Sequence, residues 1–134
     1  MTTLDEVAEE YGFGDADDRY RLLIELGRAL EPMPPALKTE ATRVAGCSAS
    51  VWIYPMQDDG RLHFLADSNA AITKGLVALA LLSVQDRTPA EVASTDIEEA
   101  LAPFDLKRQL SSNRTQGLPN MIALIRDTAK RLAG

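Results

Sequence analysis

The chain has 134 residues, a formal net charge of −6 and an isoelectric point near 4.7, and its length is typical of one domain. Hydrophobic residues make up 46% of it and charged residues 25%, which indicates a folded globular protein rather than a disordered one. The acidic balance argues against nucleic-acid binding, which relies on clustered Lys and Arg. One cysteine and one histidine exclude an internal disulfide framework and a structural zinc site of four Cys/His ligands.

The start of the chain is acidic, because seven of the first eighteen residues are Asp or Glu and none is Lys or Arg. A secretory signal would need a basic start and an apolar core. The longest strongly apolar run, Leu76 to Leu82, is far shorter than the ~20 residues that cross a bilayer. We therefore expect a cytoplasmic protein without membrane contact, organised as a single domain over residues 1–134, and one core of this size favours a monomer.

Helical spacing of apolar residues predicts two helices in the first third of the chain. The first covers residues 3–11 and stops at Gly12, and the second begins after a cap at Asp15 or Asp17. Prolines at positions 32, 34 and 35 end the second helix, because proline cannot continue the helical hydrogen-bond pattern.

The pattern changes to period two in the middle of the chain. Residues 51–56 alternate, the turn signal Asp58-Asp59-Gly60 follows, and residues 61–66 alternate again. These two segments predict a β-hairpin, in which Pro55 marks an edge or a bulge. Residues 41–45 are expected to add a short third strand.

The second half of the chain is helical. Asp67-Ser68-Asn69 is expected to cap a helix over about Ala70 to Gln85, which is apolar almost all round and therefore buried. Thr88-Pro89 is expected to begin a short helix at 89–94, and Asp96 to cap another at 97–101, which Pro103 interrupts. The last helix carries one apolar stripe, formed by Leu118, Met121, Ile122, Ile125, Ala129 and Leu132. These elements predict an α+β fold, in which a small antiparallel sheet of about three strands packs against helices on one face.

Cys47 is the residue most able to carry chemistry. It lies in Gly46-Cys47-Ser48, among small residues just before a strand, which indicates a loop that holds the sulfur near the surface. A buried, inert cysteine is an equally weighted alternative, because free cysteine is among the most buried residue types. A reactive thiol has to be available as the thiolate, and the nearest basic residue in the sequence is Arg43.

A lone cysteine limits the reactions open to the chain. A dithiol oxidoreductase needs a second cysteine, an iron–sulfur scaffold needs several cysteine ligands, and a cysteine hydrolase needs a general base, for which only His63 is available. A covalent carrier needs one nucleophilic sulfur only. A small hydrolase or transferase with a Cys47–His63 dyad remains the alternative, although a strand histidine fits a structural role better. A non-covalent adaptor, in which Cys47 is incidental, is the third hypothesis.

Two polar segments could support such a site. The segment from Asp67 to Leu76 joins the hairpin to the buried helix, and helix capping with a packing glycine is its simplest explanation. Residues 110–118 precede the last helix and contain Arg114. This arginine either belongs to a helix-entry loop or uses its planar donors to hold a carboxylate or a partner loop.

Four stretches of the chain, in this order, resemble a known family. They are Ile24-Glu25-Leu26-Gly27; Val44-Ala45-Gly46-Cys47 with Val51-Trp52; Asp67-Ser68 with Lys74-Gly75-Leu76; and Leu110 through Arg114 to Gln116-Gly117-Leu118 with Met121. The family is that of the SufE-like sulfur acceptors of iron–sulfur cluster assembly. The resemblance covers nearly the whole chain, and the combination of Gly-Cys-x-x-x-Val-Trp with Arg-x-Gln-Gly-Leu is its most specific part.

The resemblance implies the compact α+β fold shared with IscU-type scaffolds and a function in sulfur transfer. Cys47 matches the family's acceptor cysteine, which takes persulfide sulfur from a SufS-type cysteine desulfurase, stimulates that enzyme and passes sulfur to a scaffold such as the SufBCD complex. The chain would not be an enzyme and would hold no metal or cofactor, whereas the desulfurase uses pyridoxal phosphate. The matching residues expected to support the loop or contact the partner are Gly46, Ser48, Trp52, Asp67, Lys74, Arg114, Gln116 and Gly117.

Overall fold

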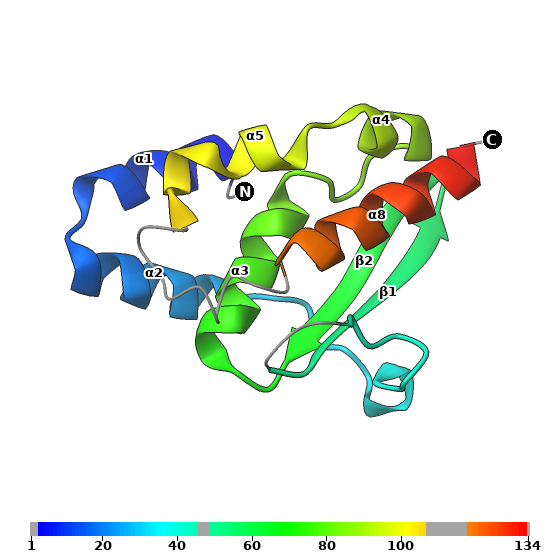
Figure 1. Ribbon diagram of the computed structural model, residues 1–134, viewed down its shortest axis with the longest axis horizontal. Coiled ribbons are helices and arrows are strands. Elements are labelled where there is room, and N and C mark those ends of the chain that lie inside the picture. Colours follow the sequence, from blue (N-terminus) through cyan, green and yellow to red (C-terminus); the bar gives the residue numbers. More distant parts are fainter. Residues whose placement is uncertain (1–2, 46–48, 107–117, 134) are drawn as a thin grey trace.

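The computed structural model describes residues 3–45, 49–106 and 118–133 of the chain (Figure 1). Two helices come first, a β-hairpin follows, and the rest of the chain is helical, so helices and strands are segregated along the chain as in other α+β proteins. The elements are α1 (Leu4–Phe13), α2 (Ala16–Arg28), the 3₁₀ turn η1 (Pro35–Leu37), β1 (Val51–Asp58), β2 (Arg61–Ser68), α3 (Ala71–Leu82), α4 (Pro89–Ser94), α5 (Ile97–Leu101), the 3₁₀ turn η2 (Ala102–Phe104) and α8 (Leu118–Ala133).

Helix α3 lies in the middle of the molecule, with α1 and α2 toward one end and the hairpin toward the other (Figure 1). It packs against α2 and β2, while α8 packs against α4. The hydrophobic core contains side chains from elements throughout the chain, from Val7 in α1 to Ala129 in α8. This arrangement agrees with the α+β class predicted from the sequence. Across the described residues, no helix combines the length and the apolar character needed to cross a membrane.

Short-range capping determines where the first helices begin. Thr3 and Glu6 form a reciprocal capping box at the start of α1, and Asp15 and Asp18 form another at the start of α2. The expected cap at Asp15 is therefore confirmed. The first helix does not stop at Gly12 as predicted, but continues to Phe13, because a single glycine near a helix end costs only about 1 kcal/mol relative to alanine.

The hairpin is regular and longer than the sequence pattern indicates. Strands β1 and β2 pair antiparallel from Val51 opposite Ser68 to Asp58 opposite Arg61. The two turn residues, Asp59 and Gly60, have φ angles of 52° and 76°, as expected for the two-residue turns that match the twist of paired strands. The same register places Trp52 opposite Asp67, so two of the predicted site residues lie side by side across the hairpin.

Both outer edges of the hairpin are partly covered. On the β2 side, the Gln85 amide accepts a hydrogen bond from Phe64 N at 2.7 Å and donates one to Phe64 O at 2.8 Å, as a neighbouring strand would. On the β1 side, Ile53 N donates outward to Thr42 O at 2.9 Å. Because alternate residues of a strand direct their backbone groups to the same side, Pro55 also faces outward, where its missing N–H costs the hairpin nothing.

The expected third strand over 41–45 is wrong as a strand. Only one residue pair, Arg43 opposite Trp52, forms a β-bridge here, and the described residues contain a sheet of two strands. The reason is local, because Thr42 already takes part in a turn. Its N–H donates to Thr39 O and its hydroxyl donates to Leu37 O at 2.6 Å, so little chain is left to extend before residue 46.

The predicted cap of the buried helix is also wrong. Asp67 and Ser68 belong to β2, and the N-cap of α3 is Ala70, which has no side-chain hydrogen bond at this helix end. The helix covers Ala71–Leu82 rather than about 70–85. As predicted, the helix is buried throughout residues 75–81. Of the polar side chains that could have capped it, Ser68 and Asn69 bond to Ser50 instead, and Asp67 pairs with Lys38 and Lys74.

Helices α2 and α3 approach closely through two glycines. A Cβ atom on Gly75 would lie 2.2 Å from Leu23 O, and one on Gly27 would lie 3.0 Å from Gly75 N. Any larger residue at position 75 therefore has to push the two helices apart. Gly27 and Gly75 belong to two of the four stretches that carry the family resemblance, and the structure explains both by packing.

Helix α8 presents the predicted apolar stripe to the core. Met121, Ile122, Ile125 and Ala129 are buried, whereas Leu132 at the end of the helix is 37% exposed. The stripe therefore ends one turn earlier than the sequence indicates. Asn120, on the first turn of α8, faces a different neighbour, which is the segment before Cys47.

Candidate functional site

The structure describes three of the predicted site residues: Trp52, Asp67 and Lys74. The other predicted positions, which are Gly46, Cys47, Ser48, Arg114, Gln116 and Gly117, lie outside the described residues. The geometry of the site therefore comes from the residues that flank Cys47 and from the charged side chains around them.

The segment before Cys47 is held at two points. Val44 is buried and its N–H donates to Val51 O at 2.8 Å. The carbonyl of Ala45 accepts a hydrogen bond of 2.8 Å from Asn120 Nδ2 on α8. These contacts fix the chain two residues before the cysteine against both the hairpin and the last helix.

The segment after Cys47 is held by the end of β2. The Ser68 hydroxyl donates to Ser50 O at 2.8 Å, and Asn69 N donates to the same carbonyl at 3.3 Å. In return, Ser50 N donates to Asn69 Oδ1 at 3.2 Å. Ser50 is thus hydrogen-bonded to two consecutive residues, Ser68 and Asn69. Because Val44 is bonded to Val51, the two ends of the short cysteine loop lie next to each other.

A charged cluster lies beside these anchors. We define the Asp67 cluster as Trp52, Asp67, Lys38 and Lys74. The Lys38 ammonium forms an ion pair with Asp67 Oδ2 and lies 5.8 Å from the centre of the Trp52 ring, and the Lys74 ammonium lies 3.2 Å from Asp67 Oδ1. The Asp67 side chain, which is only 16% exposed, therefore joins three parts of the chain: β2, the first turn of α3, and the segment between α2 and β1 that contains Lys38.

The Asp67 cluster carries a net positive charge. Burial raises the pKa of the Asp67 carboxyl, but hydrogen bonds from Lys38, the Ser68 N–H and Lys74 outweigh that effect and hold the pKa below its usual value. Asp67 is therefore ionised at neutral pH. Two ammonium groups on one carboxylate leave one positive charge in excess, next to Ser68, which holds Ser50 after the cysteine loop.

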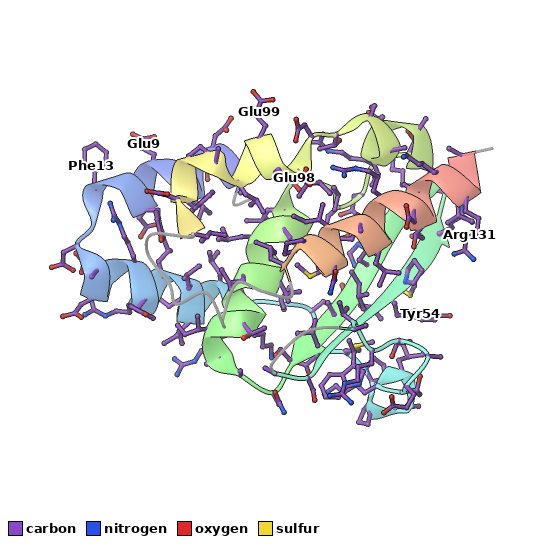
Figure 2. All side chains as sticks on the ribbon, in the orientation of Figure 1. Glu9, Phe13, Tyr54, Glu98, Glu99 and Arg131 are labelled. Atoms are coloured by element: carbon purple, nitrogen blue, oxygen red, sulfur yellow. The ribbon has the colours of Figure 1, made fainter. Side chains whose placement is uncertain are left out.

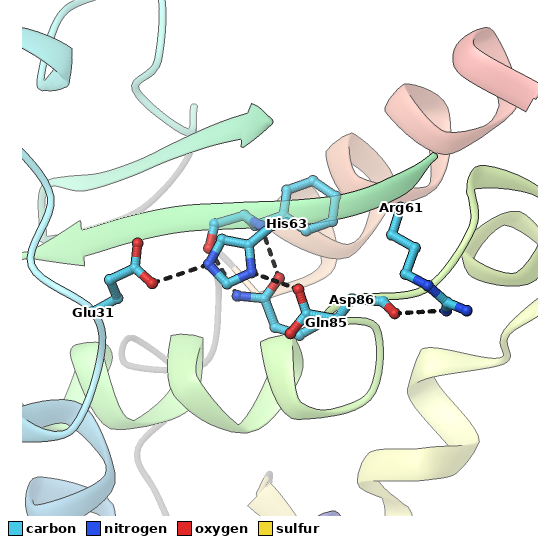
Figure 3. A network of polar contacts seen from close by, with 6 residues as sticks. Glu31, Arg61, His63, Gln85 and Asp86 are labelled. Carbon is cyan, nitrogen blue, oxygen red and sulfur yellow. Dashed lines mark hydrogen bonds and ion pairs between the residues drawn. The ribbon is translucent and has the colours of Figure 1, made fainter. Parts of the chain in front are cut away.

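His63 lies in a different environment (Figure 3). Its Nδ1 lies 2.8 Å from Asp86 Oδ1 and its Nε2 lies 3.2 Å from Glu31 Oε1. Burial lowers the pKa of His63, but hydrogen bonds and charge from Asp86 and Glu31 outweigh it and raise the pKa above its usual value. Both ring nitrogens are thus occupied by carboxylates.

The register separates His63 from the cysteine loop. His63 pairs with Met56, five residues along β2 from Ser68, and a strand rises about 3.3 Å per residue, so the two Cα atoms lie about 16 Å apart. A general base has to come within hydrogen-bond reach of its proton. This geometry favours a structural role for His63, which joins β2 to the connections after α2 and α3.

Metal binding finds no support in the described part of the chain. No group of three or more His, Cys, Asp or Glu side chains is arranged there to hold an ion. Glu31 and Asp86 face opposite nitrogens of His63 (Figure 3), so they do not converge on one point.

Sequence reasoning missed Lys38, Asn69 and Asn120 as neighbours of the site. Lys38 lies in an irregular proline-rich segment that has no periodic signal, and Asn120 lies in the first turn of a strongly amphipathic helix, whose stripe conceals it. The sequence favours a helix cap at Asn69, which is the usual role of Asn between a strand and a helix. Only the tertiary structure brings Asn69 and Asn120 to the ends of the cysteine loop and Lys38 to Asp67.

Comparison with known proteins identifies the family. The model of the SufE family, described as an Fe-S metabolism associated domain, matches residues 5–129. An uncharacterised SufE-like protein of Rhizobium etli is 35% identical over 97% of this chain and 91% of its own. The sulfur acceptor protein CsdE of Escherichia coli is 42% identical over 76% of this chain and 70% of its own.

A solved structure supports the fold independently of sequence. The solution structure of a hypothetical protein from Thermus thermophilus superposes with a TM-score of 0.77, covering 97% of this chain and 95% of its own, at 17% identity. At that identity the likeness shows the fold alone, and the fold agrees with the family assignment. With the matched residues extending from α1 into α8 and the relatives matching over most of their length, this chain belongs to the SufE family.

Proposed function

We propose that this protein is a sulfur acceptor and carrier in iron–sulfur metabolism, with Cys47 as the acceptor. It takes persulfide sulfur from a SufS-type cysteine desulfurase, stimulates that enzyme, and passes the sulfur to a scaffold of the SufBCD type. Membership of the SufE family, together with a cysteine at the family's acceptor position, carries the proposal. The relative named as a sulfur acceptor in E. coli supports it.

The transfer step needs one sulfur nucleophile. The Cys47 thiolate attacks the outer sulfur of the donor's persulfide, a new S–S bond forms on Cys47, and the donor's S–S bond breaks. The donor cysteine leaves as a thiolate with the bond's electron pair, so no oxidant or reductant is consumed. The same exchange, with a recipient thiolate as the attacking group, unloads the carrier.

The described residues support this chemistry in two ways. The hydrogen bonds at Ala45 and Ser50 fix both ends of the loop that carries Cys47. The Asp67 cluster adds an excess positive charge next to Ser68, the residue that holds Ser50, and nearby cations favour the thiolate form of a cysteine. We place the reaction in the cytoplasm, where reducing conditions keep a lone thiol free.

Intact-protein mass spectrometry tests the proposal. The protein is mixed with its SufS-type desulfurase, pyridoxal phosphate and cysteine, and its mass is recorded without reductant. We expect a gain of one sulfur atom, about 32 Da, that dithiothreitol reverses, because a persulfide is a reducible S–S bond. Cys47→Ser is the matched control and should gain nothing. A wild-type chain that gains no mass beside an active desulfurase would contradict the proposal.

A further inference from the structure

The α1–α2 end of the molecule carries the most exposed large apolar side chain among the described residues. Phe13, the last residue of α1, is 87% exposed, whereas Tyr54, Leu124 and Leu132 are exposed by 37–39%. Figure 2 shows Phe13 projecting from the end of the molecule that lies away from the hairpin. Single exposed apolar residues are ordinary on protein surfaces, so the surroundings of Phe13 decide what it can do.

Phe13 borders a groove between α1 and α2. The groove has a volume of about 370 Å³, enough for one or two side chains of another protein. Apolar surface from Tyr11, Phe13 and Leu22 lines it, together with Gly14 at the turn between the helices. Charged residues complete the lining: Glu10, Asp18, Arg19, Arg21 and Glu25.

The positive charges of the groove are already used within the chain. Arg19 Nε donates to Tyr11 O at 3.0 Å, and its guanidinium lies 5.0 Å from the centre of the Tyr11 ring. Arg21 Nη1 lies 3.4 Å from Asp18 Oδ1. Arg21 is therefore paired with a carboxylate of the groove, and Arg19 is held against Tyr11, so that Glu10, Asp18 and Glu25 in the lining still outnumber the two arginines.

The negative charges are free by comparison. Glu9 and Glu10 at the end of α1 and Glu25 on α2 are exposed, and in the described part of the chain their carboxylates form no hydrogen bond or ion pair with another side chain. Phe13 thus lies among unpaired carboxylates, in a region whose first eighteen residues carry no Lys or Arg. The groove combines an apolar contact with an acidic border.

This combination selects one class of occupant. A nucleic acid or an anionic membrane would be repelled by the acidic border. A basic segment of a partner protein would instead place an apolar side chain in the groove beside Phe13 and Lys or Arg side chains on the carboxylates. Large aromatic anchors bordered by charges are common at the centres of protein interfaces.

We propose that the groove between α1 and α2, with Phe13 at its border, docks a basic segment of the sulfur-donating desulfurase. This inference rests on the proposed function, which requires the donor to be held while sulfur is exchanged. A specific interface takes about 20–30 residues on each side, far more than the short cysteine loop supplies. The donor must therefore contact further surface, and this groove is the part of the described surface where an exposed aromatic and unpaired charges coincide.

The test measures the affinity of the purified desulfurase for the full chain and its variants by calorimetry. Phe13→Ser removes the aromatic anchor, and we expect Kd to rise about tenfold or more. The double change Glu9→Gln with Glu10→Gln should slow association and weaken the dependence of Kd on salt. Leu124→Ser and Asp127→Asn on α8 are the matched controls, and both should bind as the wild type does.

Sulfur transfer is measured on the same variants, so that two failures can be told apart. At saturating desulfurase, Phe13→Ser should still gain one sulfur on Cys47, because the substitution leaves the cysteine loop intact. Unchanged Kd for Phe13→Ser and for the Glu9/Glu10 variant overturns the docking proposal and leaves sulfur transfer standing. Weaker binding to the scaffold alone assigns the groove to the acceptor and likewise overturns it. A wild type that neither binds the desulfurase nor gains sulfur overturns both proposals.

Discussion

At each end of strand β2, one ionisable side chain is shared by two partners of opposite charge, and the signs of the charges are reversed between the two ends. At the end of the strand, one carboxylate, Asp67, is shared by the ammonium groups of Lys38 and Lys74. Four residues earlier, one imidazole, His63, is shared by the carboxylates of Glu31 and Asp86. Each side chain joins the strand to two other segments of the chain.

The difference lies in what each end is connected to. The Asp67 end is continuous with Ser68 and Asn69, which hold Ser50 beside the cysteine loop. The His63 end holds only the connections that follow α2 and α3. A shared ion pair can therefore serve stability at one end of a strand and, in the function proposed above, positioning of a reactive loop at the other.

The sharpest way to test this contrast is to remove one carboxylate at each end. Asp67→Asn leaves two facing ammonium groups without a counter-charge, and we expect a loss of about 2 kcal/mol in the free energy of unfolding. Asp86→Asn leaves Glu31 on His63 at an exposed site, and we expect a loss below about 0.5 kcal/mol. Urea unfolding of both variants measures the difference. Equal losses would show that the two ends are not distinct.

A smaller change separates the loop anchor from the charges. Ser68→Ala removes the hydrogen bond to Ser50 O at a buried position, which should cost about 1 kcal/mol. Alkylation of Cys47 should also become faster, since one end of its loop is released. Ser94→Ala, which removes a hydroxyl bonded within its own helix, is the control. An alkylation rate equal to that of the wild type would mean that Ser68 does not restrain the loop.

The two ends should also respond to pH in opposite directions. The pKa of His63 is raised on folding, so its stabilising effect is present below its unfolded value near 6.5 and is lost as the pH rises through the folded pKa. The pKa of Asp67 is lowered, so its effect is present above the unfolded value and is lost as the pH falls through the folded pKa. Urea midpoints of wild type, His63→Gln and Asp67→Asn, measured from acidic to mildly alkaline pH, should show both trends. If the difference in urea midpoint between a variant and the wild type did not vary with pH, the contact removed in that variant would be ruled out as the cause of the pKa shift.

The smallest expected effect concerns catalysis by His63. If His63 were the general base of a Cys47 dyad, His63→Ala would lower activity by about a hundredfold or more. The nitrogens of His63 face Asp86 and Glu31 instead. We therefore expect the rate of sulfur transfer to Cys47 in His63→Ala to stay within about twofold of the wild-type rate, far from the loss that removal of a general base causes. Single-turnover transfer followed by mass spectrometry measures it. A hundredfold loss would restore the dyad hypothesis.

Local signals accounted for most of the fold. The hairpin, the Thr88-Pro89 start of α4, the Asp96 cap of α5 and the stripe of α8 follow from neighbouring residues, and the structure confirms them. The failures are positions where a side chain bonds to a distant partner. Asp67, Ser68 and Asn69 look like helix caps in the sequence, yet they bind Lys38 and Ser50, which no local rule connects to them.

The candidate site was predictable only in part. The family resemblance named Trp52, Asp67 and Lys74 as residues that support the loop or contact the partner, without saying where they lie. The structure places them next to one another, through the register of the hairpin and the first turn of α3. Lys38 and Asn120 could not be found because their roles depend on how an irregular connection and the last helix pack beside the hairpin. The same holds for Glu31 at His63, since 32 residues separate the two in the chain.

The edges of the hairpin have a consequence for how this protein meets others. Gln85 and the backbone of Arg87 occupy the outer side of β2, while Thr42 and Val44 occupy the start of β1 and Pro55 offers no donor beyond them. A visiting strand would find few free groups in register, so sheet extension between chains is disfavoured. Recognition through sheet extension is thereby disfavoured at both edges, which leaves side chains as the recognition groups and protects concentrated protein from fibrous self-association.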